Sequence, residues 1–183
     1  MSVRILVAYA SRAGSTAEAA EAIGQVLRGD GLDVDVRSVV DVQSVKEAPG
    51  VLAYDALVLG SAVWVGKPLP EATRFLAAQR DALVQRPVAY FVLCDTLKED
   101  TPENRERARG FVDPLIAIKT PVSVGLFAGA RNFAGLHPLL RWLLKHVMRL
   151  AEGDWRDWDQ IRTWAANLPA HLTTEALAVG SAA

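Results

Sequence analysis

The sequence predicts an α/β domain in which helices cover both faces of a parallel β-sheet, a doubly wound arrangement. Short apolar runs alternate along the chain with segments whose apolar residues recur at helical spacing. Several of the runs are nearly continuous, as expected for strands that are buried on both faces. Strands that alternate with helices require parallel pairing, with crossover connections on both sides of the sheet.

The length and composition allow one ordinary hydrophobic core. The chain has 183 residues, of which 51% are apolar and 22% are charged. A core of this size needs neither a metal nor disulfides for stability. We expect one domain over residues 1–172, followed by a tail of small residues at 173–183 that is disordered.

Charge and cysteine content argue against several classes of protein. The formal net charge is -1 and the sequence has no basic stripe interleaved with aromatics, so nucleic-acid binding is not expected. The single cysteine, Cys94, cannot form an internal disulfide, and the N-terminal residues lack a signal-peptide pattern. We therefore expect a cytoplasmic protein. No apolar run approaches the roughly 20 residues that a membrane-spanning helix needs.

The first strand and the first helix have the clearest patterns. Residues 4–10 form a short apolar run, and apolar residues then recur at helical spacing from residue 15 to about residue 28. Ser15 and Glu18 match the capping-box pattern of a helix start, and Gly29 is a typical helix stop.

The remaining elements continue the alternation, with turn residues or prolines at most boundaries. Residues 33–40 alternate charged and apolar residues, as an edge strand does. The later elements are expected as a short helix within 41–50, a strand at 56–61, a helix from about 70 to 84, a strand at 87–94, a charged helix at 101–118, a strand at 121–128, and helices at 136–150 and 156–172.

The loop after the first strand has the composition of an anion site. It places the hydroxyls of Ser11, Ser15 and Thr16, together with the flexible backbone of Gly14, at the start of a helix. Free N–H groups and the helix dipole favour a phosphate there. The loop lacks the lysine of a Walker A motif, and the glycine pattern of a dinucleotide site is absent. The other interpretation is a turn that only caps its helix.

Two further loops are expected at the same edge of the sheet, beyond the third and fourth strands. The first of them contains Trp64, whose plane suits a flat heteroaromatic ring, and Gly66. Taken alone, Trp64 could equally be a packing residue. The second begins at Cys94, which we interpret as a small buried residue rather than a redox thiol, because no second cysteine can resolve it.

These residues resemble those of a known family. The run Leu-Val-Ala-Tyr-Ala-Ser-Arg-Ala-Gly-Ser-Thr at 6–16 resembles the phosphate signature of flavodoxins, and Trp64 with Gly66 lies where flavodoxins place residues beside the flavin mononucleotide (FMN) ring. Residues 153–161 resemble the flavodoxin branch that includes menaquinone-dependent protoporphyrinogen oxidase. The resemblance spans about residues 3–170. It implies FMN as the cofactor and a flavodoxin-like five-stranded parallel sheet in the order 2-1-3-4-5, with an extra amphipathic helix before the last helix.

The resemblance also divides the site into a phosphate part and a ring part. The phosphate would be held by Ser11, Arg12, Ala13, Gly14, Ser15 and Thr16. The isoalloxazine ring would be held by Ser61, Ala62, Val63, Trp64 and Gly66 and by Cys94, Asp95, Thr96 and Leu97. No catalytic side chain and no metal is expected, because the flavin itself accepts hydride or electrons.

Three functions remain open from the sequence. The first is an FMN-dependent oxidoreductase, similar to protoporphyrinogen oxidase, that passes electrons from a reduced organic substrate to a quinone. The second is a flavodoxin-type electron carrier; the near-neutral charge and Lys67 argue against it, because carrier flavodoxins are strongly acidic around the flavin edge. The third is a binding or structural module that has lost the flavin.

The expected helix at 136–150 is basic and amphipathic, with Arg141, Lys145 and Arg149 on one stripe. One interpretation is an interfacial helix that contacts the inner face of the cell membrane peripherally and brings the flavin to a quinone or a tetrapyrrole. The other is a helix that covers a sheet edge or a dimer interface. We expect His137 and His146 to be solvated or packed rather than metal ligands. In the last helix, Trp158, Ile161 and Trp164 are expected to pack on the sheet.

Overall fold

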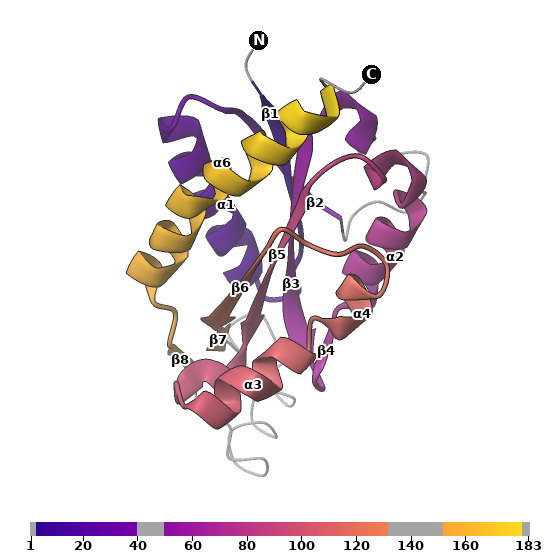
Figure 1. The fold of residues 1–183 in the computed structure, drawn as a ribbon. Helices are drawn as coiled ribbons and strands as arrows, with labels where there is room; N and C mark the ends of the chain where they lie inside the picture. Colours follow the sequence, from indigo (N-terminus) through magenta and orange to yellow (C-terminus); the bar gives the residue numbers. More distant parts are fainter. Residues whose placement is uncertain (1–2, 40–49, 132–151, 181–183) are drawn as a thin grey trace.

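A computed structural model describes residues 3–39, 50–131 and 152–180 of the chain (Figure 1). Five strands pair in parallel, in the spatial order β2-β1-β3-β5-β6. Their bounds are Arg4–Ala10 (β1), Asp33–Ser38 (β2), Ala56–Trp64 (β3), Val88–Cys94 (β5) and Ser123–Ala128 (β6). Numbered along the chain as strands one to five, they have the order 2-1-3-4-5, so the expected sheet is confirmed.

Three short strands are antiparallel additions. The strand β4, Lys67–Pro68, folds back on the end of β3, while β7, Ala130–Arg131, pairs with β8, Gly153–Asp154. The sequence prediction that the third strand ends at Ser61 is wrong. Val63 and Trp64 continue the strand because they pair with Pro68 and Lys67 of β4.

Helices cover both faces of the sheet (Figure 1). On one face lie α1, Ser15–Gly29, and α6, Trp158–Gly180, which contact each other. On the other lie α2, Pro70–Ala78, and α4, Asp113–Ile116, with α3, Pro102–Gly110, at the end of the sheet where the parallel strands finish. Single 3₁₀ turns occur at Val51–Ala53 (η1), Asp81–Leu83 (η2) and Asp95–Lys98 (η3).

Two of the expected helices differ in extent from the sequence prediction. The helix expected at 70–84 ends at Ala78 and gives way to η2. The helix expected at 101–118 is divided into α3 and α4, because Pro114 has no N–H for the carbonyl of Gly110 and its ring would collide with that carbonyl.

The last helix, α6, differs from the sequence prediction at both ends. It begins at Trp158 rather than Arg156, because the Asp157 carboxylate accepts hydrogen bonds from the N–H groups of Asp159 and Gln160 and thereby caps the helix. It continues past Leu172 to Gly180, through most of the segment that the sequence predicts as a disordered tail.

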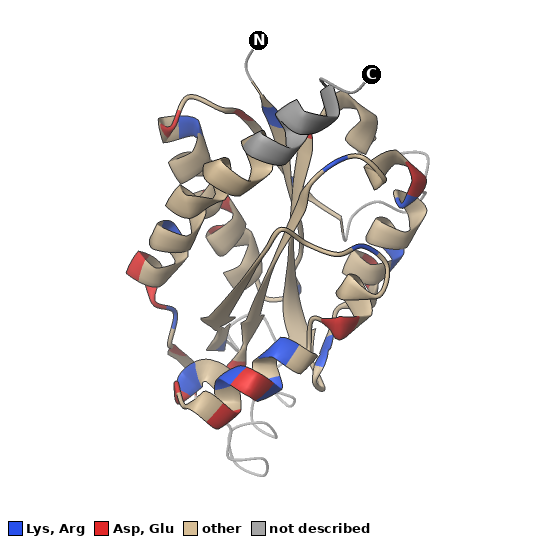
Figure 2. Cartoon of the chain, viewed as in Figure 1, with Lys and Arg blue, Asp and Glu red and all other residues tan. Residues whose placement is uncertain are grey.

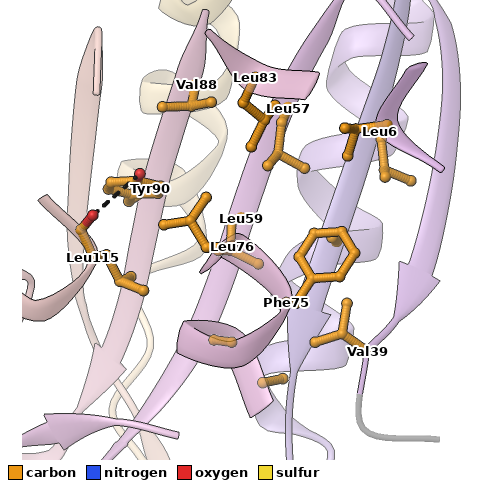
Figure 3. Close-up of a cluster of buried hydrophobic side chains, with 14 of the residues drawn as sticks. Leu6, Val39, Leu57, Leu59, Phe75, Leu76, Leu83, Val88, Tyr90 and Leu115 are labelled. Carbon is orange, nitrogen blue, oxygen red and sulfur yellow. Dashed lines mark hydrogen bonds between the residues drawn. The ribbon is translucent and has the colours of Figure 1, made fainter. Parts of the chain in front are cut away.

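The core has two layers, because successive residues of each central strand point to opposite faces. Leu6, Leu57 and Leu59 meet Phe75 and Leu76 of α2 (Figure 3). The Tyr90 hydroxyl lies in the same layer and donates a hydrogen bond to the carbonyl of Lys119 at 2.7 Å. Most residues of β1, β3 and β5 are buried on both faces of the sheet, which confirms the expectation of strands that are covered on both sides.

The opposite layer receives the last helix as the sequence predicts. Ile161 is fully buried there, and the Trp164 ring lies edge-on to Phe127 at a centroid distance of 5.7 Å. The Trp164 indole N–H donates to the Ser123 hydroxyl at 3.0 Å. Trp158 packs against the same cluster, so the packing interpretation of these tryptophans is confirmed.

Two expected helices fall outside the described residues, namely the short one within 41–50 and the amphipathic one at 136–150 with His137 and His146. Among the helices that the structure describes, none has the length and apolar content to cross a bilayer.

Candidate functional site

The carboxyl ends of the parallel strands bring the candidate loops together. Ala10 at the end of β1 is level with Ser61 of β3, Ala62 is level with Leu93 of β5, and Cys94 is level with Ala128 of β6. The loops that follow these strands therefore share one edge of the sheet, where doubly wound folds bind their ligands. In Figure 1 this edge is the lower one, with α3, β4, β7 and β8 around it.

The loop between β1 and α1 forms a backbone cradle at a helix start. Gly14 has a φ of 89°, a left-handed conformation that glycine adopts without strain. The Ser11 hydroxyl accepts a hydrogen bond from the Gly14 N–H at 3.0 Å and closes the turn. The first N–H groups of α1 have no partner within the helix, as at any helix start. The loop can therefore present amides to an anion.

The predicted capping box at this helix is wrong. Gly14, not Ser15, occupies the capping position, and among the described residues no side-chain hydrogen bond caps the helix there. Because the left-handed Gly14 makes the turn, the helix already starts at Ser15, and Glu18 instead bonds to Arg156.

Thr16 provides the sharpest test of whether this loop fits a phosphate. The residue is fully buried, and its hydroxyl oxygen has no hydrogen-bond partner among the described residues. A buried hydroxyl without a partner costs about 1–3 kcal/mol. A phosphate oxygen bound at the helix start would supply the partner, so the residues present fit the phosphate group of FMN.

Arg12 lies on the outer side of the same loop. Its guanidinium is 3.8 Å from the Glu71 carboxylate at the start of α2, and more than half of the side chain is exposed. This long and exposed pair holds the guanidinium only weakly.

The β3–β4 hairpin projects an aromatic side chain from the sheet edge. Its two central residues, Val65 and Gly66, both have positive φ, 49° and 72°, which is the requirement of a type I′ turn. Trp64 is 67% exposed and Val65 86% exposed. Exposure on this scale gives the packing interpretation of Trp64 no support among the described residues and favours a ring that is available to a ligand.

Ser61 anchors the β3–β4 hairpin at its base, through a hydrogen bond to the residue that follows β4. It is fully buried, its hydroxyl accepts a hydrogen bond from the Leu69 N–H at 2.9 Å, and it donates to the Ala62 carbonyl at 2.8 Å. The side chain is thus occupied in fixing the turn. Ala62 and Val63 lie between this anchor and Trp64; the Ala62 carbonyl also accepts a hydrogen bond from the Leu69 N–H at 3.2 Å, and Val63 pairs with Pro68 of β4.

The loop after β5 starts in the core and ends at the surface. Cys94 is buried, and burial raises the pKa of its thiol, as expected for a packing residue rather than a reactive one. Asp95 is held by an ion pair with Arg131 of β7. Thr96 and Leu97 complete the 3₁₀ turn, with Leu97 buried against Ala108 of α3.

Sequence reasoning missed three residues that close this edge, Arg131, Trp155 and Arg156. Arg131 holds Asp95, while the Lys98 ammonium lies 4.5 Å from the centre of the Trp155 ring. Arg156 reaches the first turn of α1. All three belong to β7 or to the segment after β8. The stretch at 153–161 is a recognisable pattern, but sequence alone does not show which partners its side chains contact.

The site has the features of a flavin-nucleotide site. No group of histidine, cysteine or carboxylate side chains suited to a metal occurs in the described part of the chain. A phosphate cradle, an exposed aromatic plane and a third loop at one sheet edge define a flavodoxin-like FMN-binding protein.

Comparison with known proteins places the chain in a family. The profile of the Flavodoxin domain family matches residues 6–157, so the chain belongs to that family, and FMN is the cofactor that this membership implies. It is 24% identical over 182 residues to the protoporphyrinogen IX dehydrogenase [quinone] of Escherichia coli strain K12, covering 93% of this chain and 97% of that protein.

Solved structures support the fold. Oxidised flavodoxin 1 from Bacillus cereus superposes with a TM-score of 0.52 at 21% identity, over 81% of this chain and 99% of that one. An oxidoreductase from Corynebacterium diphtheriae superposes with a TM-score of 0.59 at 16% identity, over 94% and 98% of the two chains. At these identities the likeness shows the flavodoxin-like fold alone.

Proposed function

We propose that this chain is an FMN-dependent oxidoreductase that oxidises a reduced organic substrate of the protoporphyrinogen type and passes the electrons to a quinone. The observation that carries the proposal is the match to protoporphyrinogen IX dehydrogenase [quinone], which extends over 97% of that protein. The match therefore includes more than the flavin-binding loops that all flavodoxin-like proteins share.

The first loop would hold the cofactor by its phosphate. The Thr16 and Ser15 hydroxyls and the amides that follow Gly14 lie at the start of α1, where the helix dipole also favours a dianion. Ser11 shapes the loop through its bond to Gly14. Arg12 and Ala13 form the exposed outer part of the turn.

The other two loops would hold the ring. FMN, when bound, supplies the chemistry by accepting two electrons from one partner and returning them to another. Trp64 would stack beside the ring, and the backbone of Ala62, Val63 and Gly66 would line the same side. The turn from Cys94 to Leu97 would line the other side with N–H and carbonyl groups. The ion pair with Arg131 would fix the start of this turn at Asp95.

The charges around this edge favour an enzyme over a carrier that docks basic proteins. Figure 2 shows basic and acidic residues mixed along α3, which borders the site. That helix has three arginines at 105, 107 and 109 and two glutamates at 103 and 106. Lys67 and Lys98 are exposed beside the ring loops. Docking to a basic partner would require an excess of acidic residues here.

The test is an assay of the purified protein loaded with FMN. We expect protoporphyrinogen to be oxidised with menadione as acceptor, and oxidation to stop when either FMN or menadione is omitted. Trp64→Ala should reduce the rate at least about ten-fold if the ring loop is correctly placed, since misplacement by about 1 Å is enough for larger losses.

Leu52 provides a matched control at the opposite end of the sheet. It is 69% exposed, much like Trp64, and lies in η1 before β3. Leu52→Ala should leave the rate unchanged. A stable blue neutral semiquinone on reduction, together with no turnover of protoporphyrinogen by the FMN-loaded protein, would contradict the proposal and favour an electron carrier.

A further inference from the structure

Arg156 connects the C-terminal part of the chain to the phosphate loop. Its side chain is only 6% exposed, although the residue lies between β8 and α6 near the surface. One guanidinium nitrogen, Nη1, donates to the Ser15 carbonyl at 3.2 Å and to the Glu18 carboxylate at 2.8 Å. These contacts join residues that are 141 and 138 positions apart in the sequence.

The rest of the guanidinium is held just as firmly. Nε and Nη2 donate to the two oxygens of the Asp154 carboxylate at 2.8 and 2.5 Å, a two-pronged geometry that only arginine can make. The guanidinium also lies 4.5 Å from the centre of the Trp158 ring. The hydrogen bond with Arg156 lowers the pKa of Asp154, and the same bond raises that of Arg156. The arginine is therefore a fixed positive charge.

Arg156 offsets part of the negative charge of two carboxylates, Asp154 and Glu18, close to the start of α1. Glu18 lies in the first turn of α1, one turn after the cradle. A carboxylate there suits the helix dipole but repels a dianion bound at the same helix start. Arg156 pairs with Glu18, and by binding the Ser15 carbonyl it also fixes the first residue of α1.

We propose that Arg156 is a positioning residue for the FMN phosphate, which fixes Ser15 at the start of α1 and offsets the charge of Glu18. The role concerns the affinity for the phosphate of the cofactor. It does not depend on which substrate the enzyme oxidises.

The test compares two ligands that differ only by the phosphate. Apo-protein is titrated with FMN and with riboflavin, and binding is followed by quenching of flavin fluorescence. For Arg156→Gln we expect the Kd for FMN to rise about ten-fold, in the range for loss of a charge-assisted hydrogen-bond network. The Kd for riboflavin should change less than about two-fold, since riboflavin has no phosphate to sense the change.

Arg162 is the matched control. It lies on α6, its guanidinium is 5.9 Å from the centre of the same Trp158 ring, and it pairs with Asp159 rather than with α1. Arg162→Gln should leave both affinities unchanged. Adding Glu18→Gln to Arg156→Gln should recover at least about three-fold of the lost FMN affinity, because the repelling carboxylate is then removed.

Arg156→Lys covers the case in which Arg156→Gln does not fold. Lysine keeps the charge but cannot contact Ser15, Glu18 and both oxygens of Asp154 together. Arg156→Lys should still weaken the binding of FMN more than the binding of riboflavin. Equal losses for the two ligands in either variant, or an equal loss of FMN affinity in Arg162→Gln, would overturn the proposal and leave Arg156 a purely structural residue.

Discussion

Val65 gives a prediction that isolates backbone strain at the ring loop. It is a β-branched residue with a φ of 49°, and 86% of its surface is exposed. An L-residue in the left-handed region costs about 1–2 kcal/mol, and β-branched residues are among the least tolerant. Asparagine tolerates this region, and Asn-Gly is the preferred pair of a type I′ turn. Because Val65 buries little, almost nothing is lost by replacing it.

We therefore expect Val65→Asn to stabilise the apo-protein by about 1 kcal/mol. For a chain of this length the gain corresponds to a rise in Tm of about 2–4 °C. Urea unfolding should show a higher midpoint with an unchanged m-value. Val84 is the control, since it is 65% exposed but has an ordinary φ of -50°. A gain in Val84→Asn as large as in Val65→Asn, or no gain in Val65→Asn, would refute the strain argument.

Two further predictions concern a buried hydrogen bond of Tyr90 and the pKa of the Cys94 thiol. Tyr90→Phe should destabilise the fold by about 1 kcal/mol, measured by urea unfolding, because the Lys119 carbonyl loses its buried donor; an unchanged midpoint would contradict this. Burial raises the pKa of the Cys94 thiol, so the folded chain keeps this proton at a pH where the unfolded chain releases it. Stability should thus be intact below about pH 8.5 and fall above it, and Cys94→Ala should reduce that slope; an equally steep fall in the variant would show that other groups cause it.

The parts of the fold that depend on local pattern could be predicted from the sequence. The alternation of apolar runs and helical repeats specifies the parallel sheet, and the packing of Ile161 and Trp164 follows from their spacing on one helix face. The break before α4 could also have been predicted from the sequence, because Pro114 cannot continue a helix.

Features that depend on contacts between distant segments could not be predicted. The pattern of Ser15 and Glu18 suggests a capping box, but Glu18 bonds to Arg156, which is 138 residues away. Likewise, Val65-Gly66 is not a typical hairpin sequence, and its turn forms because β4 pairs with β3. In both places the tertiary structure overrides the local preference.

The central claim is that the start of α1 binds the phosphate of FMN, and Thr16→Val tests it most directly. The variant keeps the shape of a buried side chain whose hydroxyl has no partner among the described residues. The apo-protein should therefore be at least as stable as the wild type, while a lost bond to a charged phosphate should weaken FMN about 10- to 100-fold. Riboflavin affinity should stay the same. An unchanged Kd for FMN, or equal losses for FMN and riboflavin, would contradict the placement of the cofactor.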